Sequence, residues 1–267
     1  MHIPFSRSRL LILALALMGM GLAPAAAAAP PPVPAPDSTA LDSALVQVDD
    51  LRRDGRFRDA LARINTLRQT HGDEVELLWR ASLTRVDLGK VSDGAVTEQH
   101  YQEALKLAEA ALAVGAGHPR AHLAKAVAEG RIALDAGTKE RVQRSRKVKE
   151  HADRALELDS TLAPAYHVRG RWNREVSDLN FIERTIVKTV YGGLPDASFE
   201  QAVRDFQQAI ALENVRFHHL ELGKTYLKMD REDDARAQFR TVLELPQKEH
   251  FGDRYRQEAE ALLDDLQ

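Results

Sequence analysis

The sequence of 267 residues contains no cysteine. This absence excludes disulfide bonds, thiol nucleophiles, cysteine-ligated zinc and lipidation of an N-terminal cysteine. Aromatic residues make up only 6% of the chain, whereas alanine, leucine, glutamate and arginine are abundant. Such a composition favours helices that pack closely through small side chains. The apolar fraction of 44% is still large enough to bury a sizeable core, either in one or two compact domains or in one continuous solenoid.

The sequence also lacks the short motifs that carry common catalytic chemistry. It contains no glycine-rich phosphate loop, no nucleophile elbow and no paired histidine–carboxylate motif. The formal net charge is only −3, so the total charge gives no reason to expect nucleic-acid binding. We therefore predict a protein that is not an enzyme, needs no cofactor and does not bind nucleic acid. A catalytic carboxylate pair among the many acids is the alternative that spacing alone does not test.

Two pairs of histidines are candidates for chemical sites. His118 and His122 lie at i and i+4, which would place both on one face of a helix that starts at Pro119. No acid stands between them as in a metalloprotease, so we predict no metal site and assign them to capping or surface roles. The adjacent His218 and His219 would point to different faces of a helix, at the core edge and the surface. A proton-linked switch is the alternative for this second pair.

The N-terminal stretch predicts export. Arg7 and Arg9 precede a short apolar run, Leu10 to Met18, and Ala25 to Ala29 supply small residues for a signal peptidase. The apolar run is much shorter than the about 20 residues that a membrane-spanning helix needs. We therefore predict that residues 1–29 are a signal peptide and that the mature protein is periplasmic or otherwise exported. A retained membrane anchor is the alternative.

Two regions follow the predicted signal peptide. Residues 30–37 are rich in proline, so we expect a stiff, extended spacer that cannot build a core. From residue 38 to residue 267, apolar side chains recur at three and four positions, which is the period of an amphipathic helix. These stretches pair into helix-turn-helix units of about 34 residues, the length of a tetratricopeptide repeat. We predict one all-α domain, a right-handed tetratricopeptide-type solenoid of about twelve helices with one inserted helix.

A glycine inside a predicted helix locates the insertion. Gly170 follows Tyr166 in a first helix, where glycine costs about 1 kcal/mol against alanine. We expect the reason to be a neighbouring helix pressed close against it. Gly223 has the equivalent place in the next repeat, but it lies further along the chain than one repeat length. The sequence therefore predicts an extra helix from about Asn180 to Tyr191.

Two local features of the paired helices can also be predicted. Ser198 and Gln201 fit a capping box, in which the serine accepts from the third helical N–H and the glutamine side chain reaches back. The stretch from Gly89 to Thr97 is expected to be a loop that interrupts the second repeat.

The sequence from Gly137 to Leu245 carries a recognisable pattern. Gly170-Arg171-Trp172, followed by the inserted helix, is its most specific part because generic repeats lack that combination. The other residues that carry it are Gly137-Thr138-Lys139-Glu140, Ser145, Val148-Lys149, His151, Ala155-Leu156-Glu157-Leu158-Asp159, Glu175-Val176-Ser177, Glu183-Arg184, Tyr191-Gly192, Pro195 and Gly223-Lys224. On these residues the chain resembles the regulator of microtubule dynamics family, a group of tetratricopeptide-type proteins with bacterial relatives.

The resemblance implies a helical-repeat fold and a binding role, and it implies no catalytic residues. The resemblance also extends back to Leu41, where it is weaker but follows the same order along the chain. The cytoskeletal role in the family's name is not carried over to a chain with an export signal.

First helices line the concave surface of a tetratricopeptide solenoid, so certain positions on them would face a bound segment. Mapping the repeat onto this chain gives six candidates for a partner-binding groove: Trp79, His167, Arg171, Arg174, Lys224 and Lys228. Four bases and an aromatic ring would suit a peptide that carries a carboxylate or acidic side chains. The alternative is that Arg171 and Arg174 simply pair with acids on adjacent helices.

We predict an exported, non-enzymatic scaffold that binds protein or peptide partners in this groove. The alternative is a carrier or sensor of a lipid or another apolar anion, with the inserted helix closing one end of an apolar cavity. The inserted helix is more apolar than one-sided packing requires, although packing on both faces between repeats explains this equally well. Its apolar residues are Phe181, Ile182, Ile186, Val187, Val190 and Tyr191.

A basic run lies in the long helix before the inserted one. Its members are Lys139, Arg141, Arg144, Arg146, Lys147 and Lys149. Such a run could meet phosphate or make peripheral contact with an anionic membrane surface. Because the bases surround the apolar stripe of the helix, the alternative is an ordinary solvated helix face.

Overall fold

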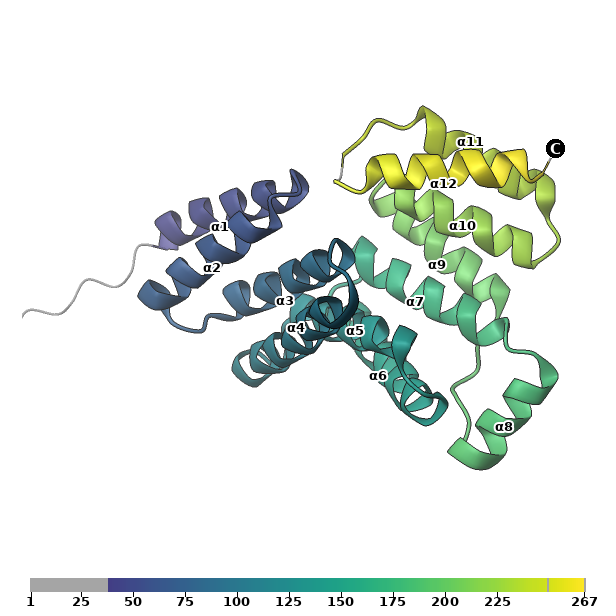
Figure 1. Ribbon diagram of the computed structural model, residues 1–267, viewed down its shortest axis with the longest axis horizontal. Coiled ribbons are helices and arrows are strands. Elements are labelled where there is room, and N and C mark those ends of the chain that lie inside the picture. The colour runs from purple at the N-terminus through teal and green to yellow at the C-terminus, as the bar shows by residue number, and fades with distance from the viewer. Residues whose placement is uncertain (1–37, 249, 267) are drawn as a thin grey trace, which may run out of the picture. The chain divides into compact units, whose positions relative to one another are not determined.

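The computed structural model describes residues 38–248 and 250–266, which form twelve α-helices and no strand (Figure 1). The predicted signal peptide and proline spacer lie outside the described residues and stay predictions. No helix of the described part combines the length and the apolar character needed to cross a bilayer. The helices are α1 (Ser38–Arg53), α2 (Phe57–His71), α3 (Val75–Lys90), α4 (Gly94–Val114), α5 (Pro119–Asp135), α6 (Thr138–Leu158), α7 (Ala163–Ser177), α8 (Phe181–Tyr191), α9 (Phe199–Leu212), α10 (Arg216–Lys228), α11 (Glu232–Glu244) and α12 (Gly252–Asp264).

The helices pair in chain order and the pairs stack. Helix α1 packs on α2, α3 on α4, α5 on α6 and α10 on α11, while α7 pairs with α9 because α8 is inserted between them. The leading helices of the pairs also pack on one another, α1 on α3, α3 on α5, α5 on α7, α7 on α10 and α10 on α12. We call these six the first helices and their common surface the first-helix face. This nearest-neighbour stacking is that of a helical solenoid, so the predicted fold class is confirmed.

Small residues bring the paired helices close together. Ala104, Ala155 and Ala202 are fully buried between helices, as are the larger Phe206 and Phe239. Burying each phenylalanine contributes roughly 1.5–3 kcal/mol. The chain thus builds its core from tight alanine contacts with a few large side chains at the repeat centres.

The two glycines of the first helices explain how those large side chains fit. A Cβ placed on Gly170 would lie 3.1 Å from the ring of Phe206 on α9, and one on Gly223 would lie 2.4 Å from the ring of Phe239 on α11. In both repeats the glycine of the first helix receives a phenylalanine from the second helix. The close neighbouring helix predicted at Gly170 is therefore confirmed, and so is the equivalence of the two positions.

The predicted loop from Gly89 to Thr97 is mostly helical. Helix α3 continues to Lys90 and α4 begins at Gly94, so residues 91–93 alone connect them. A Cβ on Gly89 would lie 2.3 Å from the ring of Tyr101 on α4. This glycine therefore allows a close helix approach instead of ending the helix, which is why the loop prediction was wrong.

The capping box predicted at Ser198 is only half formed. The Ser198 hydroxyl accepts from the backbone N–H of Gln201 at 3.1 Å, as predicted. The Gln201 side chain does not reach back but donates to the buried carboxylate of Asp205 at 3.1 Å. A complete capping box occurs instead at the start of α8, where Asn180 and Glu183 cap each other's backbone N–H groups.

The loop before α12 contacts the first repeat. The rings of Phe251 and Phe57 stack with their centroids 5.8 Å apart, and the ammonium group of Lys90 lies 4.9 Å above the Phe251 ring. The ring of His250 meets Phe57 edge-on at 5.2 Å. Side chains from the loop that precedes the last first helix thus lie against those of α2 and α3.

Candidate partner-binding face

The charged network of the first-helix face is centred on Glu221 of α10. Its carboxylate accepts from Arg174 at 2.6 Å, lies 3.1 Å from the ammonium group of Lys224, and lies 3.5 Å from Nε of Arg171. Burial would raise the pKa of Glu221, but the three cations together hold it well below its usual value. One buried carboxylate therefore neutralises three of the six groove candidates, at least in part.

Arg174 is the most completely bonded of the candidates. Its guanidinium is buried and donates to the Glu221 carboxylate, to the Glu221 backbone carbonyl at 3.2 Å and to the Glu175 carboxylate at 3.0 Å. This is the pairing with an acid on an adjacent helix that the sequence left open as the alternative. Arg174 holds α7 to α10, whereas the Arg171 side chain keeps 37% of its surface exposed.

The two candidate lysines of α10 are also paired. Lys224 bonds to Glu258 of α12 in addition to Glu221. Lys228 lies 2.7 Å from the carboxylate of Asp178 and remains half exposed. Because exposed ion pairs contribute little to stability, Lys228 can exchange its partner for an external acid at small cost.

Trp79 and His167 lie inside the stack. Trp79 is 3% exposed, donates its indole N–H to Glu76 at 2.9 Å and lies beneath the Arg80 and Arg120 guanidinium groups. His167 shares a hydrogen bond of 3.0 Å between its Nδ1 and Nδ1 of His218. Both side chains therefore join neighbouring helices and present little surface to a partner.

Burial sets the protonation state of the histidines on this face. It lowers the pKa of His167 well below its usual value and that of His218 to about 3, so both rings are neutral near pH 7. His219 does point elsewhere than His218, to Gln238 and Asn214, but both rings are buried, not at the surface.

The other histidine pair is also split between separate partners. His118 bonds to Glu76 at 2.8 Å and His122 to His151 at 2.9 Å. In residues 38–248 and 250–266 no three His, Cys, Asp or Glu side chains gather as metal ligands would.

Sequence reasoning missed two cations on this face. Lys90 of α3 bonds to Asp87 at 3.0 Å, and the same carboxylate accepts from Arg52 at 2.7 Å. Arg131 of α5 is half-buried, and burial, followed by the charge of Arg171, lowers its pKa. Both positions lie on first helices, so applying the repeat mapping to α3 and α5 as fully as to α7 and α10 would have found them.

Four of the six bases in the basic run of α6 bond to neighbouring elements. Arg144 and Lys147 pair with the buried Glu129, at 2.5 and 3.2 Å. Arg141 donates to carbonyl groups at the end of α5, and Arg146 to those of Tyr191 and Gly193 at the end of α8. These bases hold α6 to its neighbours, which is a more specific role than either a phosphate site or a solvated face.

Helix α8 leaves most of its apolar side chains uncovered. Val187 is buried, whereas Phe181 is 84%, Ile182 69% and Val190 63% exposed. Among the described helices, α8 packs on α6 alone, and Figure 1 shows it beside the stack, joined by loops to the end of α7 and the start of α9. The alternative that α8 packs on both faces between repeats is therefore wrong, and its outer face has no neighbour in the described chain.

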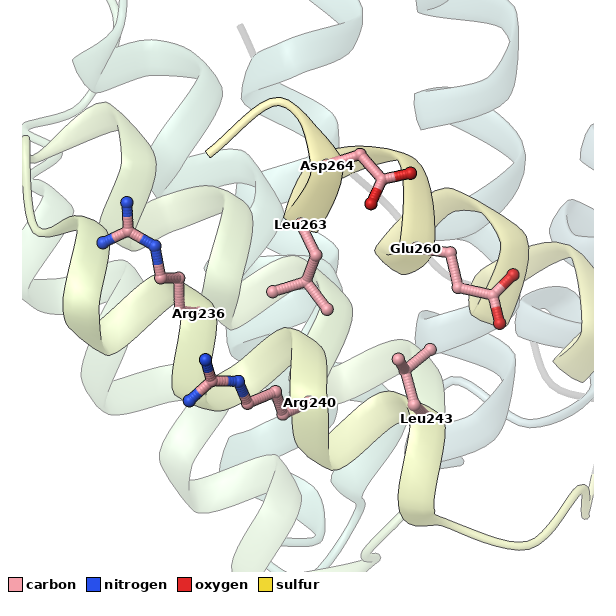
Figure 2. Close-up of a pocket in the computed structure, with 6 residues that line it drawn as sticks. All are labelled: Arg236, Arg240, Leu243, Glu260, Leu263 and Asp264. Carbon is pink, nitrogen blue, oxygen red and sulfur yellow. The ribbon is translucent and has the colours of Figure 1, made fainter. Parts of the chain in front are cut away.

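Two surface hollows lie apart from the first-helix network. One, of about 470 Å³, lies between α11 and α12 (Figure 2). Arg236 and Arg240 of α11 and Glu260 and Asp264 of α12 surround its two leucines. The other, of about 400 Å³, lies on α2, α3 and α4 around the pair formed by Arg85 and His100. Neither hollow gathers an arrangement of nucleophile and base.

Comparison with known proteins places these features in a family. A family model described as regulator of microtubule dynamics protein 1-3 matches residues 44–267. Regulator of microtubule dynamics protein 3 of Xenopus laevis is 31% identical over 140 residues, 52% of this chain and 30% of that protein. Regulator of microtubule dynamics protein 1 of Bos taurus is 27% identical over 193 residues, 71% of this chain and 60% of that protein. The chain thus spans less than two thirds of the length of these relatives.

A solved structure shows the same fold. TTC0263, a thermophilic TPR protein of Thermus thermophilus, aligns with a TM-score of 0.61 at 20% identity, over 83% of this chain and 98% of that one. At this identity the likeness concerns the tetratricopeptide-type fold alone. The family model extends from α1 to the end of the chain and includes the Gly170-Arg171-Trp172 segment with its inserted helix. The chain therefore belongs to the regulator of microtubule dynamics family.

Proposed function

We propose that the protein is an exported, non-enzymatic scaffold that binds a segment of a partner protein on its first-helix face. One observation carries the proposal: two carboxylates of this face are each shared between several cations. Glu221 serves Arg174, Arg171 and Lys224, and Asp87 serves Arg52 and Lys90. A cation that shares its carboxylate with others can also pair with an acidic segment of a partner.

The fold supports a binding role. Stacked helical pairs present an extended surface to which several repeats contribute, and such surfaces suit extended or helical segments. The microtubule-related role in the relatives' names is not proposed for this chain, because the N-terminal sequence supports export.

Site-specific photocrosslinking in the producing cell tests the proposal. p-Benzoylphenylalanine at Lys228 probes the first-helix face, and the same group at the exposed Lys106 of α4 or Gln208 of α9 probes second helices. We expect a discrete adduct from position 228 and none from positions 106 and 208. Arg171→Gln should weaken the adduct, while Arg240→Gln on α11 should not. Equal adducts from all three positions would contradict a specific face.

The export part has its own measurement. N-terminal sequencing of the protein from a periplasmic fraction should give a start between Ala27 and Pro30. An intact N-terminus in the cytoplasmic fraction would contradict it.

A further inference from the structure

We propose that the hollow on α2, α3 and α4 binds a small apolar carboxylate, an apolar group like a leucine side chain that carries one negative charge. We call it the α2–α4 hollow. The inference goes beyond the proposed function, because none of its described lining residues belongs to the Glu221 or Asp87 network. Its volume of about 400 Å³ is within the range of small-molecule pockets, roughly 300–1,000 Å³.

Helical spacing gathers the lining of the α2–α4 hollow. Helix α2 contributes one of its faces, with residues at i, i+3, i+4 and i+7: Arg58, Leu61, Ala62 and Asn65. Helix α4 contributes Val96 and His100, which stand at i and i+4. The end of α3 adds Arg85 and Leu88. The hollow thus combines charged, polar and apolar side chains from three helices.

His100 offers a hydrogen-bond donor. Nη1 of Arg85 lies 3.2 Å from Nδ1 of His100. Because a guanidinium group can only donate, Nδ1 is the acceptor, and the neutral ring carries its proton on Nε2. Partial burial and the charge of Arg85 lower the pKa of His100, so the ring is neutral near pH 7. The remaining polar group of this ring is therefore an N–H.

Arg85 carries a donor that is not satisfied. Its Nη2 pairs with Glu103 at 2.9 Å, whereas its Nε is buried and no described residue accepts the hydrogen. A buried donor without an acceptor is unfavourable for folding. Arg58, exposed on α2, lines the same hollow and adds a second positive charge. An anion that enters the hollow supplies acceptor oxygens to both guanidinium groups.

The two surface hollows differ in charge. Around the hollow between α11 and α12, two arginines accompany two carboxylates, so the charges balance (Figure 2). The described residues that line the α2–α4 hollow include two arginines and no Asp or Glu. A concave site lined by one sign of charge attracts ligands of the opposite sign. The α2–α4 hollow therefore favours an anion.

The apolar part of the lining selects the group that carries the negative charge. Leu61 and Leu88 are buried, whereas Val91 and Val96 are each 52% exposed. An apolar group in the hollow covers these valines and removes their surface from water, which is favourable. Glu103, paired with Arg85, opposes a second negative charge on the ligand. A single carboxylate on an apolar group therefore fits better than inorganic phosphate.

An NMR titration of the purified protein with isotope-labelled histidine tests the inference. The probes are isocaproate, its amide, N-acetylleucine and inorganic phosphate, and His100→Gln assigns the His100 signal. Isocaproate should shift this signal to saturation, and the amide should bind at least about 10-fold more weakly. Equal binding of the acid and the amide, or tighter binding of phosphate, would overturn the inference.

Two exposed positions supply variants that should fold normally. Arg58→Gln removes one charge and should weaken isocaproate about 10-fold. Val96→Asp adds a negative charge to the hollow and should abolish saturable binding, while an acid in the first turn suits the start of α4. Arg240→Gln, in the charge-balanced hollow, is the matched control and should leave the affinity unchanged. Unchanged affinity in both Arg58→Gln and Val96→Asp contradicts the site.

Two of the probes identify the source of the carboxylate. A free acid and the last residue of a peptide share the favoured chemistry, and N-acetylleucine represents the peptide end. Tighter binding of N-acetylleucine assigns the hollow to a peptide end, whereas tighter binding of isocaproate assigns it to a free acid. Failure of every probe would overturn this inference and leave the scaffold proposal standing, because the crosslink at position 228 measures a different face.

Discussion

The first-helix face and the inserted helix α8 are held in place by opposite means. On the face, Glu221 and Asp87 join five cations from four helices, and the network is largely buried. Among the helices of the described chain, α8 packs on α6 alone, and it exposes Ile182 and Val190 to solvent. A face built from shared charges is sensitive to the loss of any one, whereas α8 tolerates change on its outer side. Tests of this difference distinguish a binding face from a loosely attached helix.

The inserted helix compensates for its few contacts with local hydrogen bonds. An isolated helix of 11 residues is marginal in water. Asn180 and Glu183 cap its start, and Gly192, with φ of 77°, ends it in the left-handed conformation that glycine adopts readily. Thr185 and Thr189 donate their hydroxyls back to carbonyls of the same helix. Both threonine hydroxyls of α8 are therefore bonded within the helix.

The largest expected effect is on the first-helix face. Glu221→Gln removes the buried charge that serves three cations, so the free energy of unfolding should fall by about 3–5 kcal/mol. Urea denaturation measures it. Glu260→Gln, which breaks the exposed pair with Arg256, is the control and should cost less than about 1 kcal/mol. If Glu221→Gln lowers the free energy of unfolding by as little as Glu260→Gln does, the contrast between the first-helix face and α8 is contradicted.

The histidines of the stack give the second effect, through pH. Because the pKa of His218 is about 3 in the folded protein and about 6.5 when unfolded, the unfolded state binds protons first as the pH falls. Stability should therefore fall between about pH 6.5 and 5, by about 2 kcal/mol for His218 alone from pH 7.5 to 5. The pKa of Glu221 is lowered in the folded protein, so the stability that this carboxylate contributes is lost only below about pH 4.5. Glu221 therefore does not add to the pH dependence in this range.

Urea denaturation at pH 7.5 and 5 checks the histidine effect. His218→Gln should flatten the pH dependence, and so should His151→Gln to a smaller extent, because His151 has a pKa lowered to about 4. Helix α8 carries no histidine, so its local opening should not follow pH in the same range. A pH profile unchanged in both variants would contradict this account.

Glycine replacement gives a third effect within the first helices. Gly223→Ala places a methyl group 2.4 Å from the Phe239 ring, so overpacking should cost about 1–3 kcal/mol. At Gly170 the nearest ring atom is 3.1 Å away, and the gain of about 1 kcal/mol in helix propensity should offset the smaller clash. Thermal denaturation of the two variants should therefore rank Gly223→Ala below Gly170→Ala. The reverse order would show that the two repeats pack differently from the structure.

The smallest expected effect lies on α8. Ile182→Ser removes an exposed apolar side chain, so global stability should change by no more than about 0.5 kcal/mol. Arg146→Ala removes the bonds from α6 to the end of α8 and should speed amide hydrogen exchange in α8 with little change in α7 or α10. Exchange in α8 as slow as in α10 would show that α8 is as firmly held as the first helices.

Local sequence patterns were enough to place most helices. The inserted helix was predicted within one residue of its observed start, since Asn180 is its cap and Tyr191 its end. Gly89 was misjudged because a glycine that ends a helix and a glycine that admits a neighbouring ring look alike in sequence. The half-formed capping box at Ser198 also depends on tertiary packing. The Gln201 side chain donates to the buried Asp205 instead of reaching back to the cap, and the local sequence does not show that Asp205 is buried.

The sequence by itself determined the repeat class, because helical periodicity and the spacing of small residues are local properties of the chain. It also supplied the first-helix positions from which the candidate face was drawn. Only the tertiary structure decided which of those cations are engaged, since Glu221 meets Arg174 from 47 residues away. It likewise left the outer face of α8 without a neighbour among the described residues. Ion pairing and burial depend on which helices become neighbours, and packing of the whole chain sets that.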